Sequence, residues 1–246
     1  MIGERIVRVW AQIGRHSGGA PVSLAHVCAA AVDGAGVDGA GVTLMLSPTV
    51  RDAVHATDRV AGELEEWQLA FGEGPCVDAF AAGGPVLVLD LDEPDYSTRW
   101  PAFTPAALKS GARAVFALPL QVGAIRLGVL DLYRTRPGAL SPHELADALV
   151  FADTAGMLLL DQAAGTQADT ADLAWQHDDP TAHQAQVHQA TGVVLVQLGV
   201  SADVAFARLR AYAYAEDRRL GEVARAVVER RLRFDPDPSS DGPDQD

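Results

Sequence analysis

Cysteines, the residues best suited to covalent or zinc chemistry, number only two in this chain. The two cysteines, Cys28 and Cys76, stand far apart, with no second cysteine or histidine at metal-site spacing. This spacing supports neither a zinc site nor a disulfide framework, so two free thiols are expected. No nucleophile is paired with a base, and there is no glycine-rich phosphate loop, so we expect a protein that is not an enzyme.

Cys76 follows a turn whose composition suits a close approach of the backbone. Gly72, Gly74 and Pro75 form a tight turn that can bring backbone N–H groups against a ligand or against a sheet. Two interpretations of the thiol beside it stay open. It is either a redox-sensing group or a packed and inert one, and packed thiols are the more common.

Positive charge is concentrated in one stretch of an otherwise acidic chain. The formal net charge is -14, which argues against a nucleic-acid partner for the chain as a whole. Between His183 and Phe234, however, eight arginines stand against five acids, so that stretch alone is basic. The eight arginines are Arg208, Arg210, Arg218, Arg219, Arg225, Arg230, Arg231 and Arg233. Phosphate contacts are therefore expected in this stretch.

Length and composition fit a two-domain protein of the cytoplasm. The 246 residues suffice for one mid-sized domain and one small one, and 48% hydrophobic with 21% charged residues is ordinary for soluble proteins. No apolar run reaches the roughly 18 residues that a membrane span needs. The N-terminal residues mix charges among apolar positions and lack the apolar core of a secretory signal. We expect a cytoplasmic location and no membrane partner.

The elements that must position these residues alternate in the N-terminal half between helical and strand patterns. Helices are predicted at residues 1–14, 24–32, 60–70, 105–110 and 142–161, and strands at 42–46, 85–91, 114–120 and 125–133. The first helix carries an apolar stripe of Ile2, Ile6, Val9, Trp10 and Ile13. Ser141, Pro142 and Glu144 give the last helix a capping-box start. The pattern indicates an α+β domain with a central antiparallel sheet, flanking helices and terminal helices that could pair.

Three short helices are predicted in the C-terminal part. The first begins at Asp179 and Pro180 and ends at Gly199, the second is capped by Ser201, and the third spans 220–232. The inward-facing residues are predicted to be Val187, Ala190, Val194, Leu195, Leu198, Val204, Ala205, Phe206, Leu209, Ala213, Leu220, Val223, Ala224, Val227 and Val228. A core this small favours support from a dimer or from a neighbouring domain.

One motif in the N-terminal half resembles a known family. Residues 64–80, LEEWQLAFGEGPCVDAF, are followed by GGPVLVLDL at 83–91. This sequence resembles the GAF family of small-molecule sensor domains, in the branch where a Gly-Glu-Gly-Pro-Cys turn follows a Glu-x-x-Gln helix. The resemblance covers residues 15–162 and implies a bound small molecule of unidentified chemistry, because GAF domains accommodate very different ligands. The family's usual geometry implies as ligand-binding candidates Phe71, Cys76, Phe80, Asp90, Trp100, Phe116 and Asp131. For the aromatic residues, ordinary core packing is the competing interpretation.

A second resemblance begins at His188. Here the chain has an Ala-x-Gly turn, a Ser-x-x-x-Ala-Phe helix followed by Leu-Arg, and Leu-x-x-Val-Ala in the third helix. It resembles the ANTAR family of RNA-binding modules from antitermination regulators, matching at Ala190, Gly192, Ser201, Ala205, Phe206, Leu209, Arg210, Leu220, Val223 and Ala224. The family commonly has lysine where this chain has Thr191, so a charge contact is replaced by a hydroxyl.

The RNA-binding candidates combine this resemblance with spacing. If the third helix persists, Arg219, Arg230 and Arg233 fall within about 60° of one another on one edge of it. Tyrosines near Arg208 and Arg210 could stack unpaired bases. The residues expected to contact RNA are Thr191, Gly192, Arg208, Arg210, Tyr212, Arg218, Arg219 and Arg230.

The predicted organisation is a GAF-like sensor domain with its packing helix at 1–162, a linker or helical extension at 163–179, an ANTAR-like three-helix bundle at 180–234 and a disordered acidic tail at 235–246. The leading hypothesis is a homodimeric, ligand-responsive antitermination regulator that binds structured leader RNA. The alternative is a dimeric protein–protein signalling module without RNA binding. An enzyme that reduces methionine sulfoxide is disfavoured, because such GAF-fold proteins use several cysteines.

Overall fold

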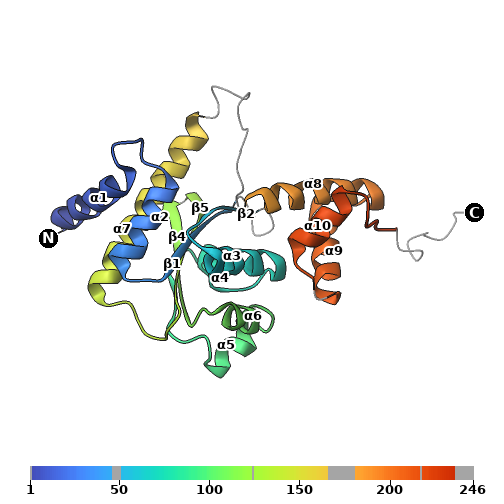
Figure 1. Ribbon diagram of the computed structural model, residues 1–246, viewed down its shortest axis with the longest axis horizontal. Helices are drawn as coiled ribbons and strands as arrows, with labels where there is room; N and C mark the ends of the chain where they lie inside the picture. The colour runs from blue at the N-terminus through green and yellow to red at the C-terminus, as the bar shows by residue number, and fades with distance from the viewer. Residues whose placement is uncertain (1, 46–50, 124, 166–180, 217, 236–246) are drawn as a thin grey trace, which may run out of the picture. The chain divides into compact units, whose positions relative to one another are not determined.

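The structure, a computed structural model, divides the protein into two compact units, residues 1–180 and 181–246 (Figure 1). The residues that it describes are 2–45, 51–123, 125–165, 181–216 and 218–235. Within these ranges, no helix is both long and apolar enough to cross a membrane. The predicted acidic tail beyond residue 235 lies outside the described residues, as does most of the predicted linker.

A five-stranded sheet forms the centre of the N-terminal unit. Its order is β2-β1-β5-β4-β3, and every neighbouring pair is antiparallel, which confirms the predicted sheet type. The strands are β1 (Gly39–Met45), β2 (Arg51–Ala56), β3 (Val86–Val88), β4 (Ala114–Val122) and β5 (Ile125–Arg134). The pattern did not predict β2, and β3 is shorter than the predicted 85–91. The hairpin of β4 and β5 is confirmed.

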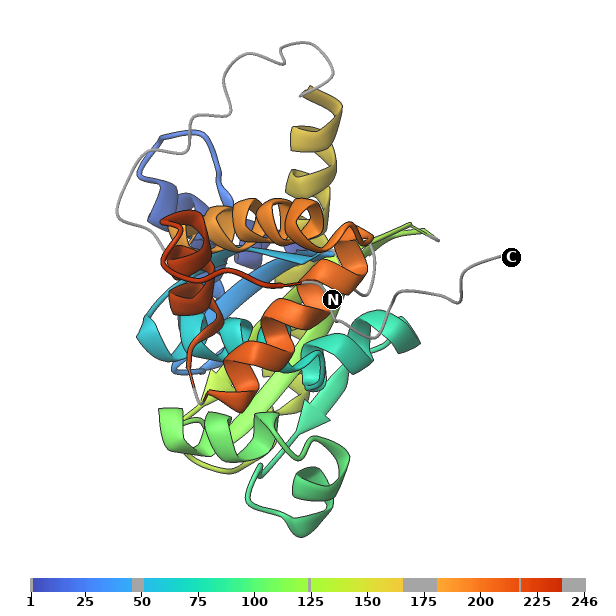
Figure 2. The ribbon, with the colours of Figure 1, turned by 90° about the vertical axis from the view of Figure 1, so that its right-hand side faces the viewer.

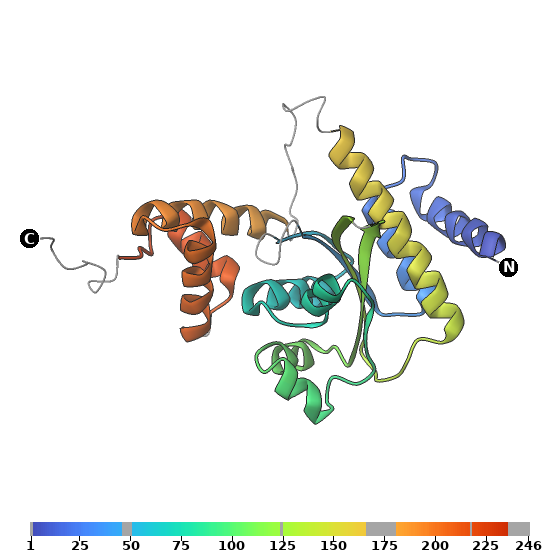
Figure 3. The same cartoon turned by 180° about the vertical axis from the view of Figure 1, so that it is seen from behind.

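Helices cover both faces of this sheet, as Figures 1 and 3 show. On one face lie α1 (Ile2–Ser17), α2 (Leu24–Ala35) and α7 (Pro142–Gly165), and on the other α3 (Arg59–Phe71), α4 (Pro75–Ala82), α5 (Pro94–Arg99) and α6 (Phe103–Ser110). Each face of the sheet has its own hydrophobic core. Alternate residues of a strand contribute to the two cores, because successive side chains point to opposite faces. Phe116, Leu118, Leu130 and Leu132 pack under α2 and α7, whereas Val115, Ala117, Val129 and Tyr133 face the other way.

Local capping explains where α7 begins. The backbone N–H of Ser141 donates to Glu144 Oε2 at 2.6 Å, and the N–H of Glu144 donates to Ser141 Oγ at 3.2 Å. This is the predicted capping box, which satisfies backbone donors that the first helical turn leaves unpaired. The helix runs on to Gly165, so residues 163–165, the start of the segment predicted as a linker or helical extension, continue α7.

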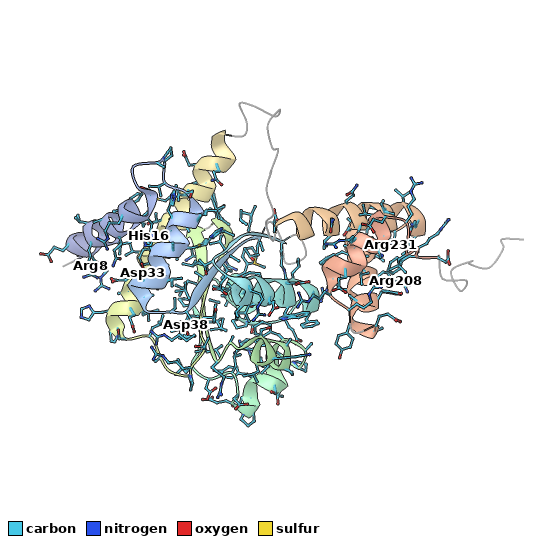
Figure 4. All side chains as sticks on the ribbon, viewed as in Figure 1. Arg8, His16, Asp33, Asp38, Arg208 and Arg231 are labelled. Atoms are coloured by element: carbon cyan, nitrogen blue, oxygen red, sulfur yellow. The ribbon has the colours of Figure 1, made fainter. Side chains whose placement is uncertain are left out.

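The first helix buries a narrower stripe than predicted. Val9 and Ile13 are fully buried, but Ile6 and Trp10 are 41% and 40% exposed. Helix α1 packs on α2 and α7 along one edge, and Arg8 pairs there with Asp147 of α7 at 2.6 Å (Figure 4). Ile6 and Trp10, on the outer side of the apolar stripe of α1, therefore remain partly exposed in this unit.

The C-terminal unit is a bundle of α8 (Thr181–Leu198), α9 (Ala202–Ala215) and α10 (Leu220–Val228), drawn in orange to red in Figure 2. Gly199 ends α8 with a φ of 64°, and Ser201 Oγ caps α9 by accepting the N–H of Val204, as predicted. Its buried core consists of Val187, Ala190, Val194, Ala205, Leu209, Ala213, Leu220, Val223, Ala224, Ala226 and Val227. The predicted inward position of Val204 is wrong, because that side chain is 44% exposed.

Helix α10 ends at Val228, four residues before its predicted end. Arg230 has a left-handed φ of 59°, and the N–H groups of Arg231 and Leu232 both donate to the carbonyl of Ala226. The chain then turns back over the bundle. The N–H of Phe234 donates to Gln197 Oε1 at 3.0 Å, and its ring meets that of Tyr212 edge-on at 5.4 Å. These tertiary contacts override the apolar pattern that predicts a longer helix.

Candidate functional sites

A buried group of polar side chains lies between the sheet and helices α3 and α4. We call Thr43, Glu65, Gln68, Cys76 and Asp131 the polar cluster; all five are buried, and Thr43 is the most exposed at 5%. Three structural features bring them together. The α3 residues are one helical turn apart, Cys76 is in the first turn of α4, and the register of β1 against β5 pairs Gly41 with Asp131.

Hydrogen bonds fix the members of the polar cluster relative to one another. The hydroxyl of Thr43 donates to Glu65, and Gln68 Nε2 donates to Asp131 Oδ2 at 3.1 Å. Gln68 Oε1 in turn accepts the backbone N–H of Cys76 at 2.7 Å. The guanidinium of the buried Arg51, on β2, donates to the backbone carbonyl of Gln68 at 3.1 Å.

The glycine turn before α4 makes the contact between Gln68 and Cys76 possible. Gly74 has a φ of 129°, a conformation that side-chain-bearing residues rarely adopt. A Cβ at this position would come within 2.7 Å of Gln68 Oε1. The turn is predicted to bring backbone N–H groups against a ligand or the sheet, but the N–H of Cys76 is instead directed at a side chain of α3.

Burial dominates the electrostatics of the polar cluster. Desolvation, and secondarily repulsion by Asp131, raises the pKa of Glu65 well above its ordinary value. Burial likewise raises the pKa of Asp131 to about 6. The pKa of the Cys76 thiol is also raised well above its usual value, by burial and then by the negative charges of Asp131 and Glu65. A thiol in these surroundings is a poor nucleophile, which favours the packed over the redox-sensing interpretation of Cys76.

The arginines of the C-terminal unit point away from its aliphatic core. Arg210 is half-buried, and its guanidinium carbon lies 5.7 Å from the centre of the Phe206 ring. The other seven are exposed, among them Arg208 and Arg231, which are labelled in Figure 4. Arg231 forms an ion pair with Glu229.

The arginines do not line one helix edge as the spacing predicts. Arg219 is the N-cap of α10 and Arg230 lies beyond its end, so no helix persists to align them. Arg208 and Arg210 are two residues apart on α9, about 200° around the helix axis, so they lie on different flanks. Tyr212 follows Arg208 by one turn, and Tyr214 follows Arg210 in the same way.

The remaining RNA-binding candidates occupy varied surroundings. The Thr191 hydroxyl donates to the carbonyl of Val187 at 2.8 Å within α8, and Gly192 is exposed with open space beside its Cα. Tyr214 is 70% exposed, whereas the ring of Tyr212 packs against that of Phe234. Tyr214 is thus better placed than Tyr212 to stack on a base.

Comparison with known families assigns both units. A GAF domain is matched over residues 23–160, more than half of the chain. The chain belongs to the GAF family. An ANTAR domain is matched over residues 181–228, which are the three helices of the C-terminal unit. GAF domains are sensor domains, and ANTAR domains are RNA-binding output domains of antitermination regulators.

Solved structures similar to this GAF protein come from several bacteria. The GAF domain of a phosphoenolpyruvate-protein phosphotransferase from Coxiella burnetii has a TM-score of 0.51 at 15% identity, covering 67% of this chain and 98% of that one. The corresponding Acinetobacter domain has a TM-score of 0.48 at 12% identity, covering 68% and 98%. The free methionine-R-sulfoxide reductase of Neisseria meningitidis, solved with its substrate, has a TM-score of 0.42 at 22% identity. The match covers 68% of this chain and 89% of that one. The likeness to the Coxiella domain shows the fold alone. A comparison with curated proteins gives no match.

The GAF domain brings together only some of the predicted ligand-binding residues. Cys76 and Asp131 are in the polar cluster, and Phe80 packs beside Cys76. Phe71 and Trp100 lie on the same side of the sheet, in the core under α3 and α6.

Two other candidates lie elsewhere in the GAF domain. Phe116 is on the opposite face of the sheet, under α2 and α7, because it and Ala117 are neighbours on one strand. Asp90 follows β3 and binds Arg113 at 2.9 Å. A single site therefore does not contain Phe116, Asp90 and Asp131 together.

Sequence reasoning did not assign three members of the polar cluster, namely Thr43, Glu65 and Gln68. The Glu-x-x-Gln spacing was visible, but nothing local shows that this edge of α3 faces the sheet. The signal available was an acid within an apolar strand: Asp131 interrupts the run Gly128–Tyr133 and therefore needs polar partners.

Proposed function

We propose that this protein is a signal-responsive antitermination regulator, in which the GAF domain senses and the ANTAR domain binds structured leader RNA in the cytoplasm. One observation carries the proposal: a domain of the RNA-binding ANTAR family closes an aliphatic core and turns its arginines outward. Eight arginines against five acids between His183 and Phe234 give it a positive field within an acidic protein.

The proposed RNA contacts have distinct chemical roles. Arg208, Arg218, Arg219 and Arg230 supply phosphate contacts, because each guanidinium is exposed. Arg210 is restrained over Phe206, which suits a geometrically specific contact. Thr191, Gly192 and Tyr212 complete the proposed set, with the open surface at Gly192 allowing close approach of a nucleotide. We propose no catalytic role for either domain.

We further propose that the protein is a homodimer joined through its terminal GAF helices. On α1, Ile6, Val7 and Trp10 are 41%, 70% and 40% exposed. On α7, Leu149, Met157 and Leu160 lie along one stripe and are 40%, 52% and 37% exposed. Apolar side chains gathered in stripes, rather than scattered, are typical of interaction surfaces.

Light scattering coupled to size exclusion should show a dimer that Met157→Glu converts to a monomer, while Leu87→Glu on β3 leaves it intact. A monomeric wild type contradicts this arrangement.

RNA binding is tested with RNA hairpins of fixed stem and randomised loop. Fluorescence anisotropy of the full-length protein is measured at several potassium chloride concentrations. We expect salt-dependent binding, and Arg208→Ala and Arg219→Ala should each lower the slope of log affinity against log salt by about 1. Arg225→Ala is the matched control, because Arg225 is exposed in the same bundle but outside the proposed contacts.

The contrary outcomes are equally definite. If no hairpin binds, or if Arg225→Ala weakens binding as much as the others, the ANTAR domain has no specific RNA surface. Protein–protein signalling would then be the better account. Crosslinking in cells separates the two, because RNA joined to peptides of α8–α10 excludes a purely protein role.

A further inference from the structure

The polar cluster contains donor atoms that hydrogen bonds do not fully satisfy. Among the described residues, Glu65 Oε1 and Asp131 Oδ1 are buried without a hydrogen-bond partner. Glu65 and Asp131 are only 3% and 4% exposed, so water is nearly excluded from both. Buried acceptors without partners cost stability, so these two oxygens call either for a proton shared between the Glu65 and Asp131 carboxyls or for a bound cation.

Three of these side chains converge closely enough to share one ion. One ligand atom each from Glu65, Cys76 and Asp131 lies within 4.8 Å of the others. They come from α3, α4 and β5, so three separate elements fix their positions. We propose that Glu65, Cys76 and Asp131 bind a divalent transition-metal ion.

The charges at the site favour a divalent cation. When all three ligands are deprotonated, two carboxylates and a thiolate carry three negative charges, and Arg51, whose positive charge acts on Cys76, supplies one positive charge. The surplus of two is what a divalent ion neutralises. A buried surplus of that size is otherwise removed only by protonation. Metal binding requires the thiol and carboxylates to be deprotonated, and the ion's own charge favours that form.

The donor set indicates which ion. Thiolate sulfur selects zinc, iron or cobalt over magnesium and calcium, which prefer oxygen ligands alone. Two carboxylates with one thiolate suit zinc or ferrous iron, and cobalt is a spectroscopic substitute. Three protein ligands leave a fourth tetrahedral position to water or to an exogenous small molecule, unlike a closed structural site.

Neighbouring groups already orient the ligands. Thr43 holds one carboxylate oxygen of Glu65, and Gln68 holds one carboxylate oxygen of Asp131. In each carboxylate the other oxygen is the one without a partner. Such outer hydrogen bonds are typical of built metal sites, where they fix ligand geometry. Gly41 contributes space, since a Cβ there would lie 2.5 Å from Glu65 Oε1.

The proposal is tested on the full-length protein, expressed with added zinc or refolded in the presence of cobalt chloride because the ligands are buried. We expect about one ion per chain by elemental mass spectrometry, and thiolate-to-cobalt charge-transfer absorption in the cobalt form. Cys76→Ser should abolish that absorption. Cys28→Ser should preserve it, because Cys28, the other buried cysteine, packs on the opposite face of the sheet. Thr43→Val should weaken zinc binding by roughly 10- to 100-fold.

The result that overturns the proposal is a wild-type protein that folds but retains no ion after either loading method. Cobalt absorption that survives Cys76→Ser would also overturn it. Circular dichroism of each variant excludes simple unfolding, and the conservative Asp131→Asn variant should lose the ion while keeping the fold. Metal retention does not depend on RNA, so this inference and the proposed function can fail separately.

Discussion

Substituting Gly128 should test how closely β1 approaches β5. Gly128 lies in β5 between Leu44 of β1 and Leu120 of β4. A methyl group there would overlap the carbonyl oxygen of Thr43, and it would lie 3.0 Å from that residue's carbonyl carbon and 3.1 Å from Leu44 Cα. These are backbone atoms, which cannot rotate out of the way. Gly128→Ala must therefore push β1 away from β5.

The cost follows from two effects. Adding a methyl group to a filled interior costs about 1–3 kcal/mol. Moving β1 outward also weakens at least one sheet hydrogen bond, worth about 1 kcal/mol. We expect the free energy of unfolding of the GAF domain to fall by about 2–4 kcal/mol in total. In a domain of this size that lowers the Tm by about 4–16 °C. Because Thr43 holds Glu65, metal retention should fall as well.

Gly156→Ala is the matched control, because it adds the same methyl group close to the same part of the sheet. Its Cβ would lie 3.7 Å from Leu120 Cβ, an ordinary contact. Alanine is favoured over glycine within a helix by about 0.5–1 kcal/mol, so this variant should be as stable as the wild type or more so. Thermal and urea unfolding followed by circular dichroism measure both variants.

The refuting result is specific. Suppose that the free energy of unfolding of Gly128→Ala lies within about 1 kcal/mol of the wild-type value, a smaller loss than the two effects together require. The two strands then have room for the methyl group, which contradicts the contact distances. If Gly156→Ala is the more destabilised of the two, the tight contact lies under α7 instead.

Two further predictions concern capping and the ANTAR core. The hydrogen bond from the Ser141 N–H lowers the pKa of Glu144, so the stabilisation from this cap is present above the unfolded value of about 4.3 and is lost as pH falls through the lower folded value. Glu144→Ala, which removes the acceptor, should therefore cost about 0.5–2 kcal/mol at pH 7, and urea titrations at lower pH should show the deficit shrinking below about pH 4. Leu209 is fully buried in the bundle, and Leu209→Ala should cost about 2–5 kcal/mol, which is enough to unfold a domain this small. Amide hydrogen exchange should then show lost protection in α8–α10 alone, and unchanged protection there would contradict a marginal core.

Elements with local signals could be predicted from the sequence. The start of α7 depends on Ser141 and Glu144, three residues apart, and the end of α8 depends on Gly199. Elements set by distant contacts could not. Strand β2 has Arg51 and Asp52 among small residues, so its sequence lacks a clear strand pattern. It lies at the edge of the sheet, beside β1. Helices α4 and α5 are short, and only a proline in the first turn marks each beginning.

The polar cluster shows the same limit for a site. Cys76 and Asp131 could be proposed from family geometry, but Glu65 is joined to them only through the sheet register and the packing of α3. Spacing rules for metal sites search for ligands that are near in sequence. They therefore miss a group of ligands that comes from three different elements. The absence of metal-site spacing in the sequence does not exclude a metal site formed by Glu65, Cys76 and Asp131.

Strand β5 joins the two halves of the GAF domain mechanically. It carries Asp131 on one face, and three residues later Arg134 reaches the other. There the guanidinium donates to the carbonyls of Ala35 and Gly36 at the end of α2, and to Glu144 in the first turn of α7. Under the proposed function, a signal that displaced β5 would thus alter the anchorage of α7, the helix that leads along the chain toward the ANTAR domain.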